Sequence, residues 1–154
     1  TVLGNSGTLI SVENRAEHAE VGVANMTRLE HILPEFPDWH LIQGDLAVAS
    51  REASGICEDL DAVIIDMAEP WSVLSEIVPL LRIGGRLACY CPTTSQLERS
   101  WGEVESLGLV VEWSGEVVER KWTKASKGGV RPGNQPIGHT AFLLISAKTA
   151  EEEE

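Results

Sequence analysis

The sequence predicts an α/β fold: a doubly wound, mostly parallel sheet with an antiparallel C-terminal edge. The first observation is that short apolar runs alternate with stretches of helical spacing, as in βα units. The second is the run from Ala62 to Ile65, which is rich in β-branched residues and lies between acids, as in a buried parallel strand. The third is that the last two apolar runs have no helix between them, which predicts an antiparallel pair.

The strands are expected where apolar runs are bounded by turn residues or acids. They are 8–13, 39–43, 62–65, 86–91, 109–113 and 140–146, with an extension of the fifth to 118 left open. The segment 47–58 fits either a loop or a broken helix. The segment 123–138 is long and rich in Gly and Pro, which is typical of a functional or disordered loop.

Three helices are expected between these strands. The first follows Arg15 and runs to about residue 31, because apolar residues recur at helical spacing until two prolines break the pattern. The second begins at Pro70, a residue suited to the first helical turn, and runs to about residue 81. The third covers 96–106, with Ser95 as its expected N-cap.

The length and charge of the chain indicate how many domains it has and which partners it can bind. Its 154 residues suit one domain over 1–148, followed by an acidic tail at 149–154 that we expect to be disordered. No apolar run approaches the roughly 18 residues that span a bilayer, and the start does not resemble a signal peptide. The net charge of −12 argues against nucleic acid, yet residues 120–131 hold five basic residues and no acid. That basic segment suits either a polyanion or a solvated connection.

The cysteines predict neither disulfides nor a metal site. Cys57, Cys89 and Cys91 are few, odd in number and without the ligand spacing of zinc sites. We expect reduced, mostly buried thiols in a cytoplasmic protein.

Acids end three of the predicted strands. Glu13, Asp45 and Asp66 would share one edge of the sheet, where open α/β folds bind ligands. The first acid occupies the position at which nucleotide-binding sheets place a carboxylate on ribose hydroxyls. The alternative for each acid is ordinary capping of the turn that follows its strand.

The chain resembles a known family at several of these positions. The matching segments are Ser11-Val12-Glu13-Asn14-Arg15, Gly44-Asp45-Leu46, Ile65-Asp66-Met67-Ala68-Glu69-Pro70-Trp71, Gly84-Gly85-Arg86, Tyr90 to Gln96, Val130-Arg131-Pro132 and Gly138-His139-Thr140-Ala141-Phe142-Leu143. In this order and spacing they resemble the S-adenosylmethionine-dependent tRNA (adenine-N1)-methyltransferases that modify adenine 58 of the T-loop. The segment from Asp66 to Trp71 most resembles actinobacterial members of that family. The last two segments are the most specific.

The resemblance implies a Rossmann-like class I methyltransferase fold and a role for each matching residue. The implied catalytic residues are Asp66, facing the target base near the methyl group, and Tyr90, lining the same pocket. The implied cofactor residues are Glu13 on the ribose, Asp45 and Leu46 beside the adenine, and Asp66. The implied substrate residues are Pro70, Trp71, Thr93, Gln96, Arg131 and His139. Core packing is the favoured alternative for Trp71, and His139 suits a structural role equally well.

The family's first strand and its Gly-rich cofactor loop have no counterpart in this sequence. We therefore expect a C-terminal fragment, truncated at the N-terminus and inactive alone. The lost strand would lie between the Glu13 and Asp66 strands, and we expect the gap to close by direct pairing or by a strand from a second chain. Ala68 also stands where many relatives have proline, which leaves the turn after Asp66 less constrained.

The implied function is methylation of N1 of a tRNA adenine by S-adenosylmethionine, without a metal or a membrane, in a cytoplasmic homo-oligomer that is a tetramer in the family. The alternatives are a methyltransferase acting on a protein or small molecule and a non-catalytic binding or assembly module. A dinucleotide-dependent oxidoreductase is weakened by the missing glycines.

Overall fold

The computed structural model describes residues 2–133, 138 and 140–150, and it divides into two compact units. The first unit holds residues 1–61 and 75–82, and the second holds residues 62–74 and the chain from residue 83 onward. Strands and helices alternate along the chain as the sequence predicts as far as residue 109, after which the described elements are all strands.

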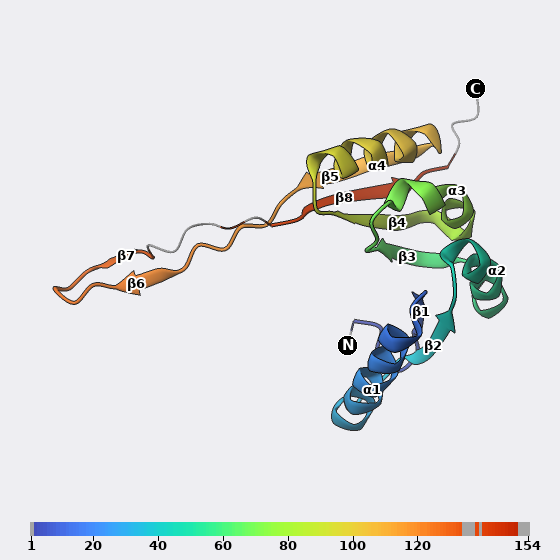
Figure 1. The fold of residues 1–154 in the computed structure, drawn as a ribbon, viewed down its shortest axis with the longest axis horizontal. Helices are drawn as coiled ribbons and strands as arrows, with labels where there is room; N and C mark the ends of the chain where they lie inside the picture. The colour runs from blue at the N-terminus through green and yellow to red at the C-terminus, as the bar shows by residue number, and fades with distance from the viewer. Residues whose placement is uncertain (1, 134–137, 139, 151–154) are drawn as a thin grey trace. The chain divides into compact units, whose positions relative to one another are not determined.

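The first unit contains a two-stranded parallel sheet and two long helices (Figure 1). Strand β1 (Thr8–Glu13) pairs in parallel with β2 (Asp38–Gln43), and helices α1 (Ala16–Ile32) and α2 (Leu46–Ile56) follow them. Its buried cluster joins Ile42 of β2 to Ala49 and Ala53 of α2, with apolar side chains of β1 packed against it. Ala49 and Ala53 are four residues apart on one helical face and are both buried, which favours the helix α2 where the sequence left a loop or a broken helix open.

The second unit contains a four-stranded sheet in the order β3-β4-β8-β5. The strands are β3 (Leu60–Ile65), β4 (Leu81–Cys91), β5 (Leu109–Gly115) and β8 (Phe142–Lys148). Strand β8 is antiparallel to both β4 and β5, with a bulge between Val111 and Trp113. The expected antiparallel pair is present, but β8 lies inside the sheet and β5 is the edge.

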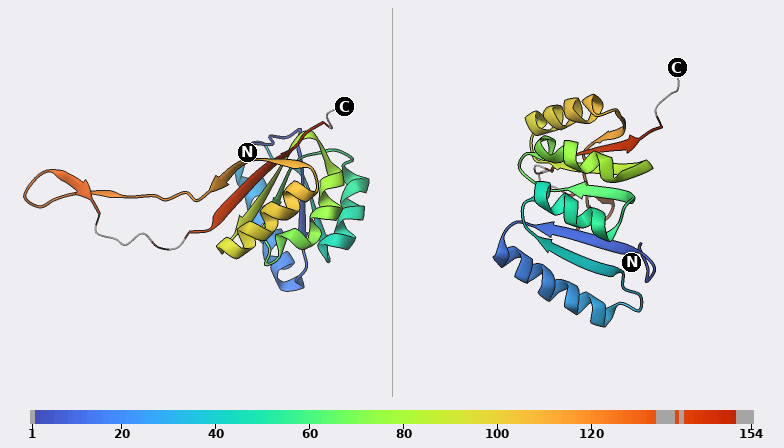
Figure 2. Two further views of the ribbon diagram at one scale, coloured as in Figure 1. Left: turned by 90° about the horizontal axis from the view of Figure 1, so that it is seen from above. Right: turned by 90° about the vertical axis from the view of Figure 1, so that its right-hand side faces the viewer.

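Helix α4 (Thr94–Ser106) packs against β5 and β8 (Figure 2). Its Val104 is fully buried, as are Leu87, Cys89 and Leu144 on the sheet. This apolar layer holds the second unit together through area removed from water.

The segment 123–138, expected to be a loop, instead contains a short hairpin. Strand β6 (Trp122–Lys124) is antiparallel to β7 (Val130–Pro132), and Gly128 and Gly129 between them have the positive φ angles that tight turns require. Figure 1 shows this hairpin beyond the four-stranded sheet of the second unit.

Two further expectations are wrong, and of a third only one of its two alternatives, direct pairing of the Glu13 and Asp66 strands, is contradicted. The helix expected over 70–81 is three short pieces, η1 (Pro70–Val73), α3 (Leu74–Ile77) and η2 (Val78–Leu80). Pro79 cannot donate a helical hydrogen bond, which accounts for the end of α3 before η2. The N-cap of α4 is Thr93 and not Ser95: Thr93 has extended backbone, and its hydroxyl accepts from the amide of Gln96. Direct pairing of β1 with β3 does not occur among the described strands, which place β1 and β3 in separate sheets.

Within the described part of the chain, no helix is both long and apolar enough to cross a membrane. The same residues contain no group of three or more His, Cys, Asp or Glu side chains that could hold a metal ion.

Candidate active site

The acids Glu13 and Asp45 lie at the carboxyl edge of the sheet in the first unit. Glu13 is the last residue of β1 and stands opposite Gln43, the last residue of β2. The amide of Gly44 donates to the carbonyl oxygen of Glu13 at 3.1 Å, so the chain leaves β2 directly beside β1. The structure thus brings these two predicted cofactor residues to neighbouring strand ends.

Glu13 carries a carboxylate suited to a hydroxyl-bearing ligand. The backbone amide of Arg15 donates to its Oε1 at 2.9 Å, and this bond lowers the pKa of the Glu13 carboxyl. The guanidinium of Arg15 lies 3.7 Å from the same oxygen and acts in the same direction. The side chain is 32% exposed, so an ionised acceptor faces solvent at this strand end.

Asp45 immediately precedes helix α2. Its carbonyl oxygen accepts from the amides of Val48 at 3.0 Å and Ala49 at 2.8 Å, and its side chain is exposed. Leu46, the first helical residue, is half-buried beside it. The exposed carboxylate of Asp45 and the apolar side chain of Leu46 thus lie next to each other at the start of α2.

Asp66 opens a short turn in the second unit. It follows Ile65, the last residue of β3, and its side chain is exposed. The turn ends at Pro70, which is fully buried and begins η1. Trp71 follows, half-buried, with the guanidinium of Arg99 4.6 Å from its ring centroid.

The start of α4 is tied to this turn. Gln96 donates from Nε2 to the carbonyl oxygen of Ala68 at 2.8 Å, while its Oε1 accepts from the amide of Thr93 at 2.9 Å. Because Ala68 follows β3 and Thr93 follows β4, these bonds place the carboxyl ends of both strands at one edge of the second unit. Asp66, Trp71, Thr93 and Gln96 are therefore gathered at that edge.

Three predicted residues remain. Tyr90 is the next-to-last residue of β4, opposite Leu143, and is 41% exposed. Arg131 is on β7 of the hairpin, exposed and opposite Thr123. His139 lies outside the described residues.

Sequence reasoning missed Arg99. The signal available was its position three residues after Gln96, which puts both side chains on one face of α4. The stacking on Trp71 requires knowledge of how α4 packs on η1, which the spacing does not contain.

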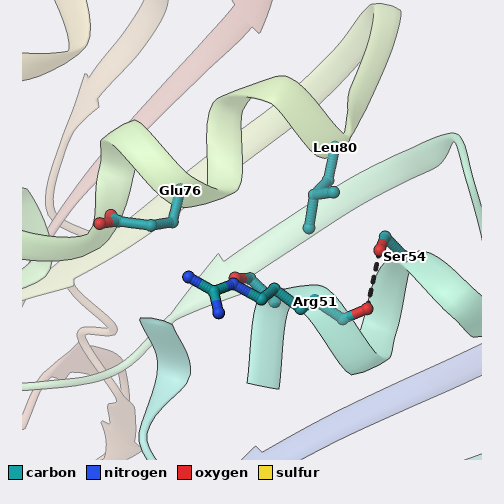
Figure 3. Close-up of a pocket in the computed structure, with 5 residues that line it drawn as sticks. Arg51, Ser54, Glu76 and Leu80 are labelled. Carbon is teal, nitrogen blue, oxygen red and sulfur yellow. Dashed lines mark hydrogen bonds between the residues drawn. The ribbon is translucent and has the colours of Figure 1, made fainter. Parts of the chain in front are cut away.

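A separate open cavity of about 270 Å³ lies in the first unit (Figure 3). It is lined by Ser50, Arg51 and Ser54 of α2, together with Glu76 and Leu80. Glu76 and Arg51 both extend into this space, and the Ser54 hydroxyl donates to the carbonyl oxygen of Arg51 at 2.8 Å. None of the predicted site residues lines it.

The solved structures that share this fold include methyltransferases. The S-adenosylmethionine-dependent O-methyltransferase from Thermotoga maritima matches with a TM-score of 0.81 and 26% identity, over 98% of this chain and 53% of that one. The tRNA (m1A58) methyltransferase TrmI from Aquifex aeolicus matches with a TM-score of 0.70 and 19% identity, over 94% of this chain and 54% of that one. The chain has the Rossmann-like fold of S-adenosylmethionine-dependent methyltransferases.

Comparison with curated sequences finds relatives among the methyltransferases that act on tRNA. A TrmI tRNA (adenine-N1)-methyltransferase of Methanocaldococcus jannaschii is 26% identical over 166 residues, which cover 94% of this chain and 57% of the relative. One from Thermus thermophilus is 30% identical over 145 residues, covering 92% of this chain and 52% of the relative. The chain is a homologue of these tRNA (adenine-N1)-methyltransferases, which confirms the resemblance seen in its motifs. It spans about half the length of these curated relatives, and no protein-family model matches it.

Proposed function

We propose that the protein containing this chain methylates N1 of an adenine in tRNA, with S-adenosylmethionine as the methyl donor. The observation that carries the proposal is the homology to enzymes of that activity over more than nine-tenths of this chain. In this proposal residues 1–148 belong to the catalytic domain and Asp66 contacts the target base.

The first unit offers groups that fit the nucleoside part of the cofactor. The Glu13 carboxylate, ionised and partly exposed, can accept hydrogen bonds from both hydroxyls of a ribose. Asp45 and Leu46 would flank the adenine, the first as an acceptor for its amino group and the second as an apolar wall. S-adenosylmethionine bound there supplies a methyl group on a sulfonium.

The reaction needs little covalent help from the protein. The lone pair of adenine N1 forms the new N–C bond as the S–C bond breaks and its electron pair remains on sulfur, which becomes a thioether. The adenine gains a positive charge in that step. N1 is hidden by base pairing, so the base must first leave its stack.

Asp66 is the residue suited to the developing charge. Its exposed carboxylate at the end of β3 would accept a hydrogen bond from the N6 amino group, orienting the base, and would stabilise the cation by its negative charge. It could equally take the N6 proton. Tyr90 would line the pocket from β4, and Pro70 and Trp71 would form the wall behind Asp66. Thr93 and His139 would make further contacts with the substrate.

The hairpin, residues 120–133, supports a polyanionic substrate. Five basic residues fall within 120–131 of a chain whose net charge is −12, and Arg131 is exposed on β7. Attraction of RNA phosphates to such a local basic segment is strong at low salt. The hairpin also carries Trp122 and Val130, 63% and 67% exposed, which favours the homo-oligomer implied by the family.

The test is nucleoside mass spectrometry of unmodified tRNA incubated with the full-length protein and cofactor. We expect 1-methyladenosine, and we expect Asp66→Asn to lower kcat by about 100-fold or more while S-adenosylhomocysteine binds as before. Asp59→Asn is the matched control, because that exposed acid lies outside the site. Absence of 1-methyladenosine would refute the proposal, and retained kcat in Asp66→Asn would refute the role of Asp66.

A second candidate is methylation of a small molecule, favoured by the 0.81 TM-score to an O-methyltransferase. The same incubation with low-molecular-weight acceptors in place of tRNA separates the two. Methyl transfer to those acceptors and not to tRNA would support it.

A further inference from the structure

The turn that carries Asp66 depends on another segment for its geometry. Residues 66–69 join β3 to η1, and at the η1 end the carbonyl oxygen of Glu69 accepts from the amide and the hydroxyl of Ser72. Asp66 and Ala68 are both exposed, whereas Met67 between them is half-buried. The hydrogen bond that anchors the middle of the turn comes from α4.

Gln96 links the turn to α4 with a single amide group. Its Oε1 accepts from the amide of Thr93 at 2.9 Å and from the Thr93 hydroxyl at 2.8 Å, as part of a capping box. With the oxygen fixed by the cap, the Nε2 of the same amide is aimed at Ala68 and donates to its carbonyl oxygen at 2.8 Å. The two bonded residues are 28 positions apart in the chain, and the acceptor, Ala68, lies two residues after Asp66.

Arg99 makes a second link between the same segments. It lies three residues after Gln96, and its guanidinium stacks 4.6 Å from the centroid of Trp71 in η1. Helix α4 thus contacts the turn at Ala68 and just beyond its end at Trp71.

We propose that Gln96, assisted by Arg99, is a positioning residue that holds the Asp66 turn in the geometry needed for methyl transfer. The inference rests on the proposed role of Asp66 and deepens it, because Gln96 acts here through the turn and not by touching the base. A carboxylate that orients a base loses its effect when displaced by about 1 Å, a shift that can lower a rate by about 100-fold.

The chemistry of the amide provides a selective variant. In Gln96→Glu the carboxylate still accepts from the Thr93 amide, so the capping box and α4 are retained. Its second oxygen can no longer donate and instead faces the carbonyl oxygen of Ala68, acceptor against acceptor. Glu98→Gln is the matched control, an exchange between the same two side chains at an exposed position of α4.

The experiment measures tRNA methylation by the full-length protein with Gln96→Glu, Asp66→Asn and the double variant. We expect Gln96→Glu to lower kcat by about 10- to 100-fold with unchanged S-adenosylhomocysteine affinity, and to cost nothing further in the Asp66→Asn background, because residues that act as a unit are not additive. A full, independent loss in that background, or wild-type kcat in Gln96→Glu, would overturn the proposal.

Hydrogen exchange keeps the test separate from the proposed function. Amides of residues 67–69 should exchange several-fold faster in Gln96→Glu while those of α4 are unchanged. If the wild-type protein methylates no tRNA, the proposed function fails and this exchange alone decides whether the link exists. Unchanged exchange in the turn would overturn the link itself.

Discussion

The substitution Ser146→Ala should make the protein more stable. Ser146 lies on β8 between Leu87 of β4 and Val111 of β5 and is fully buried. Among the described residues its hydroxyl oxygen has no hydrogen-bond partner. Burying an unpaired hydroxyl costs about 1–3 kcal/mol, whereas the void left by one oxygen atom costs only about 0.3 kcal/mol. We therefore expect a gain of about 1 kcal/mol.

Ser100→Ala is the matched control. Ser100 is equally buried, on α4, but its hydroxyl oxygen accepts from the Cys91 thiol at 3.7 Å. Losing that bond costs about 0.5–1 kcal/mol, and the better helix propensity of alanine returns about 0.5 kcal/mol. The expected net change is close to zero.

Urea unfolding followed by tryptophan fluorescence measures both variants. A gain of about 1 kcal/mol moves the midpoint by about 0.5 M urea at an unchanged slope, and the melting temperature by about 2–4 °C. The reasoning is refuted if Ser146→Ala is no more stable than Ser100→Ala.

Three further predictions concern thiols, the ribose carboxylate and the hairpin. Burial raises the pKa of the Cys89 thiol to about 12 and also raises the pKa of Cys91 on the same strand. A thiol reagent should therefore label only Cys57 in the native protein and all three cysteines in urea, as counted by mass spectrometry. Rapid labelling of Cys89 or Cys91 in the native protein would contradict their burial. The Arg15 amide lowers the pKa of Glu13, so the stabilisation from that bond is complete above the pKa of the unfolded chain and is lost as pH falls through the folded value. Because this carboxyl stays ionised, calorimetry should show a constant affinity for S-adenosylhomocysteine between about pH 5 and 8. Glu13→Gln should lower that affinity about tenfold, whereas the control Glu17→Gln should not. An equal loss of affinity in both variants would reject the ribose assignment. Arg131→Ala should weaken RNA binding in a filter-binding assay and reduce the slope of log K against log salt concentration by about 0.7–0.9. The control Arg28→Ala on α1 should change neither quantity. An unchanged slope in Arg131→Ala would show that this arginine does not contact RNA phosphates.

Much of the fold follows from local patterns. Periodicity two or helical spacing identifies β1, β2, α1 and α4 because it depends only on neighbouring residues, and the strand-end acids Glu13 and Asp66 are visible for the same reason. It left α2 undecided and missed the first five residues of β4. The sequence places the cap of α4 two positions too late because Thr93, Thr94 and Ser95 all have side chains able to cap, and only the backbone conformation selects Thr93.

The sequence by itself determined the alternation of strands and helices, the acids at strand ends and, through its motifs, the family it resembles. The tertiary structure decided the insertion of β8 between β4 and β5 and the formation of the hairpin at 122–132. It also decided that Gln96 reaches Ala68 and that Arg99 stacks on Trp71. The first of these contacts joins residues 28 positions apart in the chain, and contacts at such a separation are set by how elements pack and not by the propensity of any local window.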